Sequence, residues 1–77
     1  MMARRQDVPI AFRASIVIEP SGRKVVTTAR FIAELEKVNH HYSPSQANDY
    51  IVRYERSWKL LEEKDNGLNT YFMFNSY

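Results

Sequence analysis

The residues best equipped for chemistry in this chain are two adjacent histidines, His40 and His41, and three serines, Ser43, Ser45 and Ser57. Adjacent histidines point in different directions on a helix, and neither a cysteine nor a well-spaced set of carboxylates accompanies them, so the pair does not predict a metal site. The serines lack a His-Asp pattern around them, and two glycines in the whole chain cannot build a glycine-rich phosphate loop. The sequence therefore predicts neither an enzyme nor a bound metal or cofactor.

Length and composition indicate a small globular protein. The 77 residues are 44% hydrophobic and 26% charged, which is ordinary for a folded domain. A domain of this size buries only about 60% of the surface of its unfolded chain, so dimerisation would stabilise it. There is no cysteine, and no apolar run approaches the roughly 20 residues of a membrane span. We expect a cytoplasmic protein that does not enter a membrane.

Charge is unevenly distributed along the chain. The net charge of +2 does not by itself predict a partner. Residues 1–30 hold six basic and two acidic side chains, whereas residues 31–77 hold five basic and seven acidic ones. We expect residues 1–7 to be a flexible basic arm and residues 8–77 to be a single domain.

The clearest local signal is a helix start at "SPSQ", residues 43–46. Ser43 can cap the first turn, Pro44 suits the first helical position, and Gln46 can reach back to the cap amide. Apolar residues then follow at helical spacing: Ala47, Tyr50, Ile51, Tyr54 and Trp58.

The end of this helix is open between two interpretations. Leu61 extends the apolar stripe, so a single helix could continue to Glu63. Alternatively the helix ends near Ser57 and two strands flank Asn66-Gly67, the preferred pair for a tight hairpin turn. The alternating aromatics of "TYFMF" need a pairing partner, which favours the hairpin, and a helix to about Leu60 with a shorter hairpin is an intermediate possibility.

Two further elements precede the capping box. Residues 28–39 carry an apolar stripe typical of a helix, with Thr27 or Thr28 as its cap, and residues 40–43 form a tight connection. Residues 8–19 alternate between apolar and other side chains, which favours a strand, although Ala11, Phe12, Ser15 and Ile16 also share one face of a short helix that Asp7 could cap.

This order of elements resembles a winged helix-turn-helix domain. The resemblance lies in "VVTTARFIAELEKV", "YSPSQANDYIVRYERSWKLLEEKDNG" and "LNTYFMF" and covers about residues 23–75. It implies an α+β fold with two or three helices and a C-terminal β-hairpin, to which the alternating pattern adds a short N-terminal strand. Domains of this type usually begin with a full helix, whereas residues 8–19 alternate as a strand does.

The resemblance also implies a DNA-binding surface. The recognition helix would use Ser45 and Gln46 on base edges and Arg53 and Arg56 on phosphates. The expected contacts of the helix, the hairpin and the N-terminal arm are together Ser45, Gln46, Asn48, Asp49, Arg53, Arg56, Lys64, Asn66, Asn69, Arg4 and Arg5.

Two functions are consistent with these features. The first is a small bacterial or phage regulator that binds double-stranded DNA. The alternative is a protein-binding adaptor or a phage-encoded inhibitor of a host protein on the same scaffold, because Asp49 and Glu55 disfavour phosphate. A strand that is apolar on both faces further predicts a homodimer through Tyr71, Phe72, Met73 and Phe74.

Overall fold

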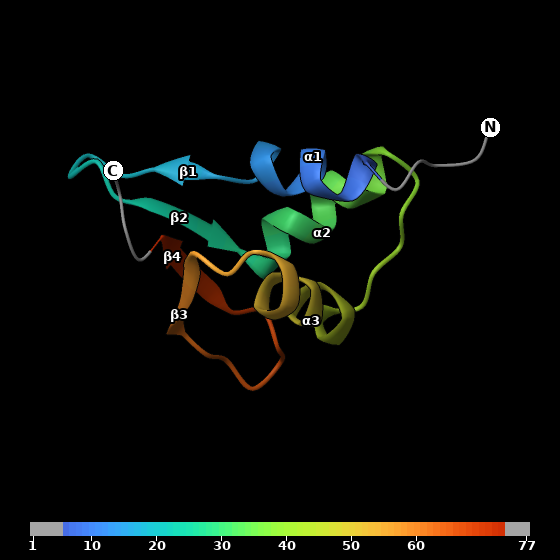
Figure 1. Cartoon of the computed structure of the whole chain (residues 1–77). Helices are drawn as coiled ribbons and strands as arrows, with labels where there is room; N and C mark the ends of the chain where they lie inside the picture. The colour runs from blue at the N-terminus through green and yellow to red at the C-terminus, as the bar shows by residue number, and fades with distance from the viewer. Residues whose placement is uncertain (1–5, 74–77) are drawn as a thin grey trace.

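The computed structural model describes residues 6–73 and has an α+β architecture (Figure 1). Its helices are α1 (Asp7–Ala14), α2 (Thr28–Lys37) and α3 (Pro44–Tyr54). Its strands are β1 (Val17–Ile18), β2 (Lys24–Thr27), β3 (Trp58–Glu62) and β4 (Thr70–Met73). The helices lie together, and the β1–β2 hairpin extends away from them. The predicted fold class is confirmed at this level.

The sheet is antiparallel, with the strand order β1-β2-β4-β3. The last strand of the chain is therefore an inner strand, held between β2 and β3. Val26 pairs with Tyr71, and Tyr71 pairs with Leu60, so these three share the face that is turned to the helices. A register shift between Leu60 and Glu62 breaks the regular pairing at the outer end of β3.

Aromatic rings form the centre of the core. Phe12 from α1 meets Phe31 from α2 and Trp58 from β3 edge-on, with centroid distances of 5.4 Å in both pairs. All three side chains are buried. Edge-to-face pairs of this kind add to the stabilisation from burial, so one residue of α1 links a second helix to the sheet.

The strand expected over residues 8–19 is wrong. This segment begins with α1, and its strand is limited to Val17–Ile18. Val8, Ala11 and Phe12 are buried at helical spacing, whereas Ile10 is 53% exposed. The period-two alternation was coincidental here, because the 3.6-residue period buries Ala11 beside Phe12 and turns Ile10 to solvent.

The helix α2 begins at the cap that the sequence predicted. Thr27 caps α2, its side chain accepting the Arg30 amide at 3.2 Å. Asn39 ends the helix in a left-handed conformation, with φ of 67°. The amide of His40 then donates to the Leu35 carbonyl at 2.9 Å, so Asn39 takes the role that glycine often plays at a helix end.

The hairpin interpretation of residues 58–73 is confirmed, with α3 ending at Tyr54. Trp58 therefore belongs to β3 rather than to a continued helix. The connection between β3 and β4 covers residues 63–69, which is longer than the tight turn expected around Asn66-Gly67. Within residues 6–73, no helix is long and apolar enough to cross a membrane.

Candidate nucleic-acid interface

The N-terminus of α3 is fixed by the predicted capping box. The Ser43 hydroxyl accepts the Gln46 amide at 3.2 Å, and the Gln46 Oε1 accepts the Ser43 amide at 2.9 Å. Pro44 occupies the first turn, where no intrahelical hydrogen bond is lost. These local bonds set the start of the helix and hence which of its residues face the hairpin.

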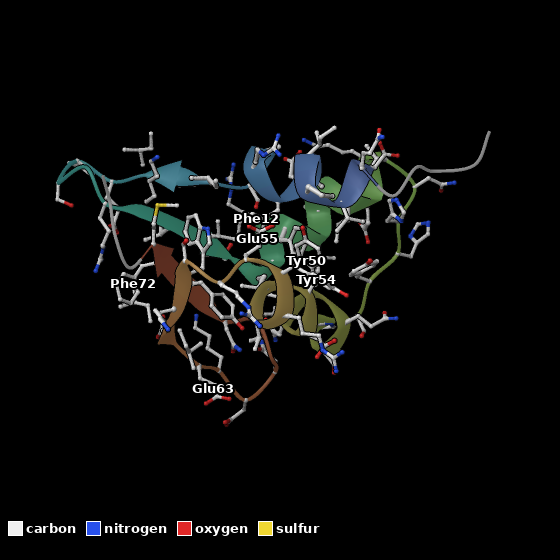
Figure 2. The ribbon with its side chains drawn as sticks, in the orientation of Figure 1. Phe12, Tyr50, Tyr54, Glu55, Glu63 and Phe72 are labelled. Carbon is white, nitrogen blue, oxygen red and sulfur yellow. The ribbon has the colours of Figure 1, made fainter. Side chains whose placement is uncertain are left out.

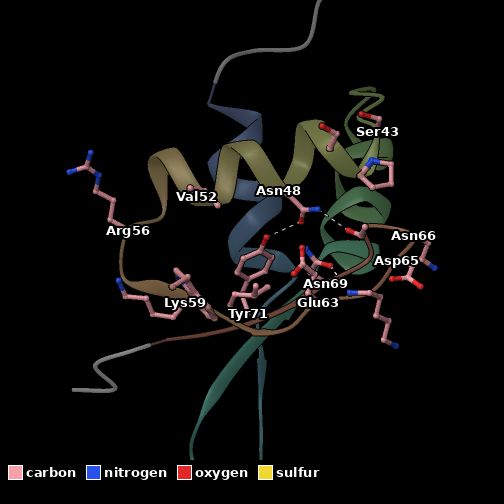
Figure 3. A pocket seen from close by; sticks show the side chains of 16 residues that line it. Ser43, Asn48, Val52, Arg56, Lys59, Glu63, Asp65, Asn66, Asn69 and Tyr71 are labelled. Carbon is pink, nitrogen blue, oxygen red and sulfur yellow. Dashed lines mark hydrogen bonds between the residues drawn. The ribbon is translucent and has the colours of Figure 1, made fainter.

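Asn48 connects α3 to three other parts of the fold (Figure 3). Its Oδ1 accepts the Thr28 hydroxyl at 2.7 Å and the Tyr71 hydroxyl at 3.1 Å. Its Nδ2 donates to the Gly67 carbonyl at 2.8 Å. The amide therefore ties α3 to the start of α2, to β4 and to the hairpin loop, and we call this set of bonds the Asn48 junction.

Asn69, the last residue of the hairpin loop, adds further bonds to the Asn48 junction. Its Oδ1 accepts the Lys64 amide at 3.0 Å, and its carbonyl accepts the Thr28 amide at 2.9 Å. Its own amide donates to the Thr28 hydroxyl at 3.2 Å. Because Asn69 is 6% exposed, these bonds satisfy groups that water does not reach.

The hairpin loop has the backbone that an Asn-Gly pair allows. Gly67 has φ of 80°, and its amide donates to the Lys64 carbonyl at 2.9 Å. The Asn66 Oδ1 accepts the Leu68 amide at 3.0 Å. A Cβ on Gly67 would lie 3.1 Å from the Pro44 Cβ, so glycine also lets the loop approach α3 closely.

A groove of about 1060 Å³ runs between α3 and the β3–β4 hairpin. Figure 3 shows Asn48 and Tyr71 joined across it and Val52 on the adjacent turn of α3. Basic and acidic side chains mix along its walls, together with exposed apolar ones. The charged members and the exposed apolar members are Arg56, Lys59, Lys64, Glu63, Asp65, Val52 and Leu60.

The structure separates the predicted DNA contacts into three groups. Ser45, Arg56 and Lys64 are exposed residues that line the groove. Exposed side chains with an internal partner form the second group, namely Gln46 in the capping box, Asn66 in its loop and Asp49 with Arg53, whose carboxylate and guanidinium are 3.0 Å apart. Asn48 and Asn69 belong to the Asn48 junction, and Arg4 and Arg5 lie outside the described residues.

The side chains predicted for a dimer interface are used mostly inside the subunit. Tyr71 is 4% exposed and Met73 packs against the core, because β4 is an inner strand. Phe72 lies on the other face, with the Arg23 guanidinium 5.9 Å from its ring centroid. Phe74 lies outside the described residues. The dimer itself stays a prediction.

Sequence reasoning did not find several residues that line the groove, among them Val52, Lys59 and Leu60. Val52 is an apolar residue, 66% exposed, within the polar side of α3, and that interruption was the available signal. Lys59 and Leu60 were missed as groove residues because their position depends on the pairing of β3 with β4.

Comparison of the chain with known protein families, with curated proteins and with solved structures found no match in any of the three. No group of three histidine, cysteine, aspartate or glutamate side chains within residues 6–73 is placed to hold a metal ion.

Proposed function

We propose that this chain is a small DNA-binding protein of winged-helix type, in which α3 and the β3–β4 hairpin form one contact surface. The element order supports this: α1, then β2, the pair α2 and α3, and the hairpin. The helix α1 stands where the sequence suggested a strand and where domains of this type have their first helix. The short β1 adds a strand at the outer edge of the sheet.

The observation that carries the proposal is the attachment of the hairpin loop to α3. Because β4 lies between β2 and β3, the loop returns to the N-terminal half of α3, where Asn48 bonds Gly67. The exposed side of α3 and the loop are thus held together before any ligand arrives. A prearranged surface loses little entropy on binding, which favours recognition of a rigid duplex.

The available side chains suit different parts of a duplex. Ser45 and Gln46 lie in the first turn of α3, where hydroxyl and amide groups can bond base edges. The Gln46 amide nitrogen takes no part in the capping box and remains a donor. Arg56 and Lys64 at the groove would hold phosphates, and the exposed Asp49–Arg53 pair is weak enough to exchange for a phosphate contact.

The charge balance limits how strong the electrostatic part of binding can be. The chain has 11 basic and nine acidic residues. Arg4 and Arg5 are two of the basic ones, so the rest of the chain is neutral overall. We therefore propose that few phosphates are neutralised and that the arm supplies some of these contacts. Each neutralised phosphate contributes about −0.9 to the slope of log affinity against log salt.

The test is fluorescence anisotropy of a labelled mixed-sequence duplex at several salt concentrations. The variant Arg56→Gln/Lys64→Gln should lower the affinity and reduce the salt slope by about two. The control Arg23→Gln/Lys37→Gln removes the same charge away from the groove and should leave the slope nearly unchanged. The proposal is wrong if wild type does not bind at low salt, or if both variants lose the same affinity.

A second candidate, a protein-binding module, is favoured by one observation. Val52 and Leu60 line the same groove and are 66% and 48% exposed, where a DNA-binding surface would be polar. Glu62 and Glu63 follow them on the hairpin. Its test is capture of a partner by wild type that is abolished by Val52→Asp/Leu60→Asp, in a protein that shows no salt-dependent binding to DNA.

A further inference from the structure

A second cavity, of about 590 Å³, lies on the opposite side of α3 from the groove. Tyr50 and Tyr54 are one helical turn apart on α3. Each is two positions away from Val52, which lines the groove, so the tyrosines and Val52 lie on opposite sides of the helix. The N-terminus of α1 and the segment after α2 form the remaining walls. The cavity, here called the tyrosine pocket, is lined by Val8, Pro9, His40, Tyr42, Tyr50, Tyr54 and Glu55.

Aromatic rings form most of the tyrosine pocket. The Tyr50 ring packs against Phe31, with 5.5 Å between the ring centroids. The Tyr54 ring packs against Tyr50, with a centroid distance of 5.3 Å. Tyr42 comes from the segment between α2 and α3, with the His40 ring perpendicular to it at 6.2 Å. Figure 2 shows Tyr50, Tyr54 and Glu55 together between α3 and α1. The pocket therefore offers π surfaces from two separate segments.

The electrostatic character of the tyrosine pocket is negative. The half-buried Glu55 carboxylate accepts the Tyr50 hydroxyl at 2.8 Å through Oε2. Tyr54 and Glu55 also end α3, where the helix dipole places partial negative charge. No lysine or arginine is among its lining residues, although the charge of Arg13 acts on Tyr50. Carboxylate, helix end and ring faces all favour a positive ligand.

We propose that the tyrosine pocket binds an organic cation, a guanidinium or alkylammonium group presented by a peptide. Such a group can lie against Tyr42 and Tyr54 while its charge is balanced by Glu55. Two sources share this chemistry: an arginine of the chain's own N-terminus, Arg4 or Arg5, and a side chain of another molecule. The site faces away from the groove, so it does not depend on the proposed DNA binding.

The experiment is an NMR titration of the full chain, following the tyrosine ring resonances. The probes are N-acetyl-arginine-methylamide and tetramethylammonium chloride, with sodium chloride at equal ionic strength as the blank. Saturable shifts at Tyr42 and Tyr54 are expected with both cations and not with sodium. Tyr54 is 69% exposed, so Tyr54→Leu should fold normally and weaken binding about three-fold to ten-fold.

Two matched controls separate the site from general effects. Glu55→Gln should weaken binding, whereas Glu62→Gln, an equal charge change on β3, should not. Phe72→Leu removes an aromatic ring from the outer sheet face, away from the pocket, and should leave affinity unchanged. Equal losses in Glu55→Gln and Glu62→Gln would overturn the proposal, because attraction would then follow net charge alone.

The variant Arg4→Gln/Arg5→Gln distinguishes the two sources. If the chain's own arginines fill the pocket, the variant alters the Tyr54 ring resonances without any probe and binds added cation more tightly than wild type. If the ligand is external, both proteins bind the probes equally. Absence of saturable shifts in both proteins would show that the pocket takes no organic cation.

Discussion

On the hairpin side of α3, a single amide bonds a hydroxyl from α2, a hydroxyl from β4 and a carbonyl of the loop, whereas on the α1 side Tyr50 packs between the rings of Phe31 and Tyr54. The hydrogen bonds on the hairpin side are directional, so they fix where the hairpin loop lies. The α1 side is built by packing and leaves a cavity beside it. The directional hydrogen bonds of Asn48 thus lie on the side of α3 that we propose binds duplex DNA.

The largest expected effect concerns the aromatic side. Phe12→Ala removes a fully buried ring that contacts both Phe31 and Trp58, and it should lower the free energy of unfolding by about 3–5 kcal/mol. Urea denaturation followed by circular dichroism measures this. Ile10→Ala, on the exposed side of the same helix, is the control and should stay within about 0.5 kcal/mol of wild type. Similar losses in both variants would contradict the central place given to Phe12.

The next effect concerns the Asn48 junction. Asn48→Ala leaves the Thr28 hydroxyl, the Tyr71 hydroxyl and the Gly67 carbonyl without this partner, and it should cost about 2–3 kcal/mol. Hydrogen exchange should also become faster in the hairpin loop than in α1. The neighbouring exposed substitution Asp49→Ala serves as the control. A cost below about 1 kcal/mol, with unchanged exchange in the loop, would show that Asn48 does not hold the hairpin.

The smallest effect depends on pH. Burial, and then the hydrogen bond to Glu55, raise the pKa of the Tyr50 hydroxyl above its ordinary value of 10.0. The folded state therefore keeps this proton when the unfolded chain loses it, and the resulting stability is present below about pH 10 and lost as the pH rises further. Tyr50→Phe should weaken the decline in melting temperature between pH 9 and pH 11. Parallel curves for the two proteins would contradict the assignment.

The sequence predicted features whose causes are local. The capping box at Ser43, the cap of α2 by Thr27 or Thr28 and a turn at Asn66-Gly67 involve partners a few residues apart, so residue types and spacing were enough. The Asn48 junction could not be predicted in this way, because its partners lie 19 to 23 residues away in the chain. From the sequence alone, an asparagine on a helix is expected at the surface. Only the position of the hairpin loop shows that Asn48 bonds the loop.

The N-terminal segment shows a different limit. Residues 8–19 fit both a strand and a helical period, and the choice was made by contacts of Phe12 with α2 and β3, which are distant in sequence. The aromatic C-terminal strand was assigned to a dimer for the same reason. The strand β4 pairs with β2 on one side and β3 on the other, so Tyr71 and Met73 pack in the core of a single subunit.

The central claim is that α3 and the hairpin loop bind DNA as one surface, and amide chemical-shift mapping during a duplex titration tests it most directly. The account predicts salt-sensitive shifts at Ser45, Val52, Arg56 and Lys64, while Tyr50 and Tyr54 on the other side of α3 change little. Shifts centred on the tyrosine pocket or on the outer sheet face around Phe72, or no shifts at low salt, would contradict it.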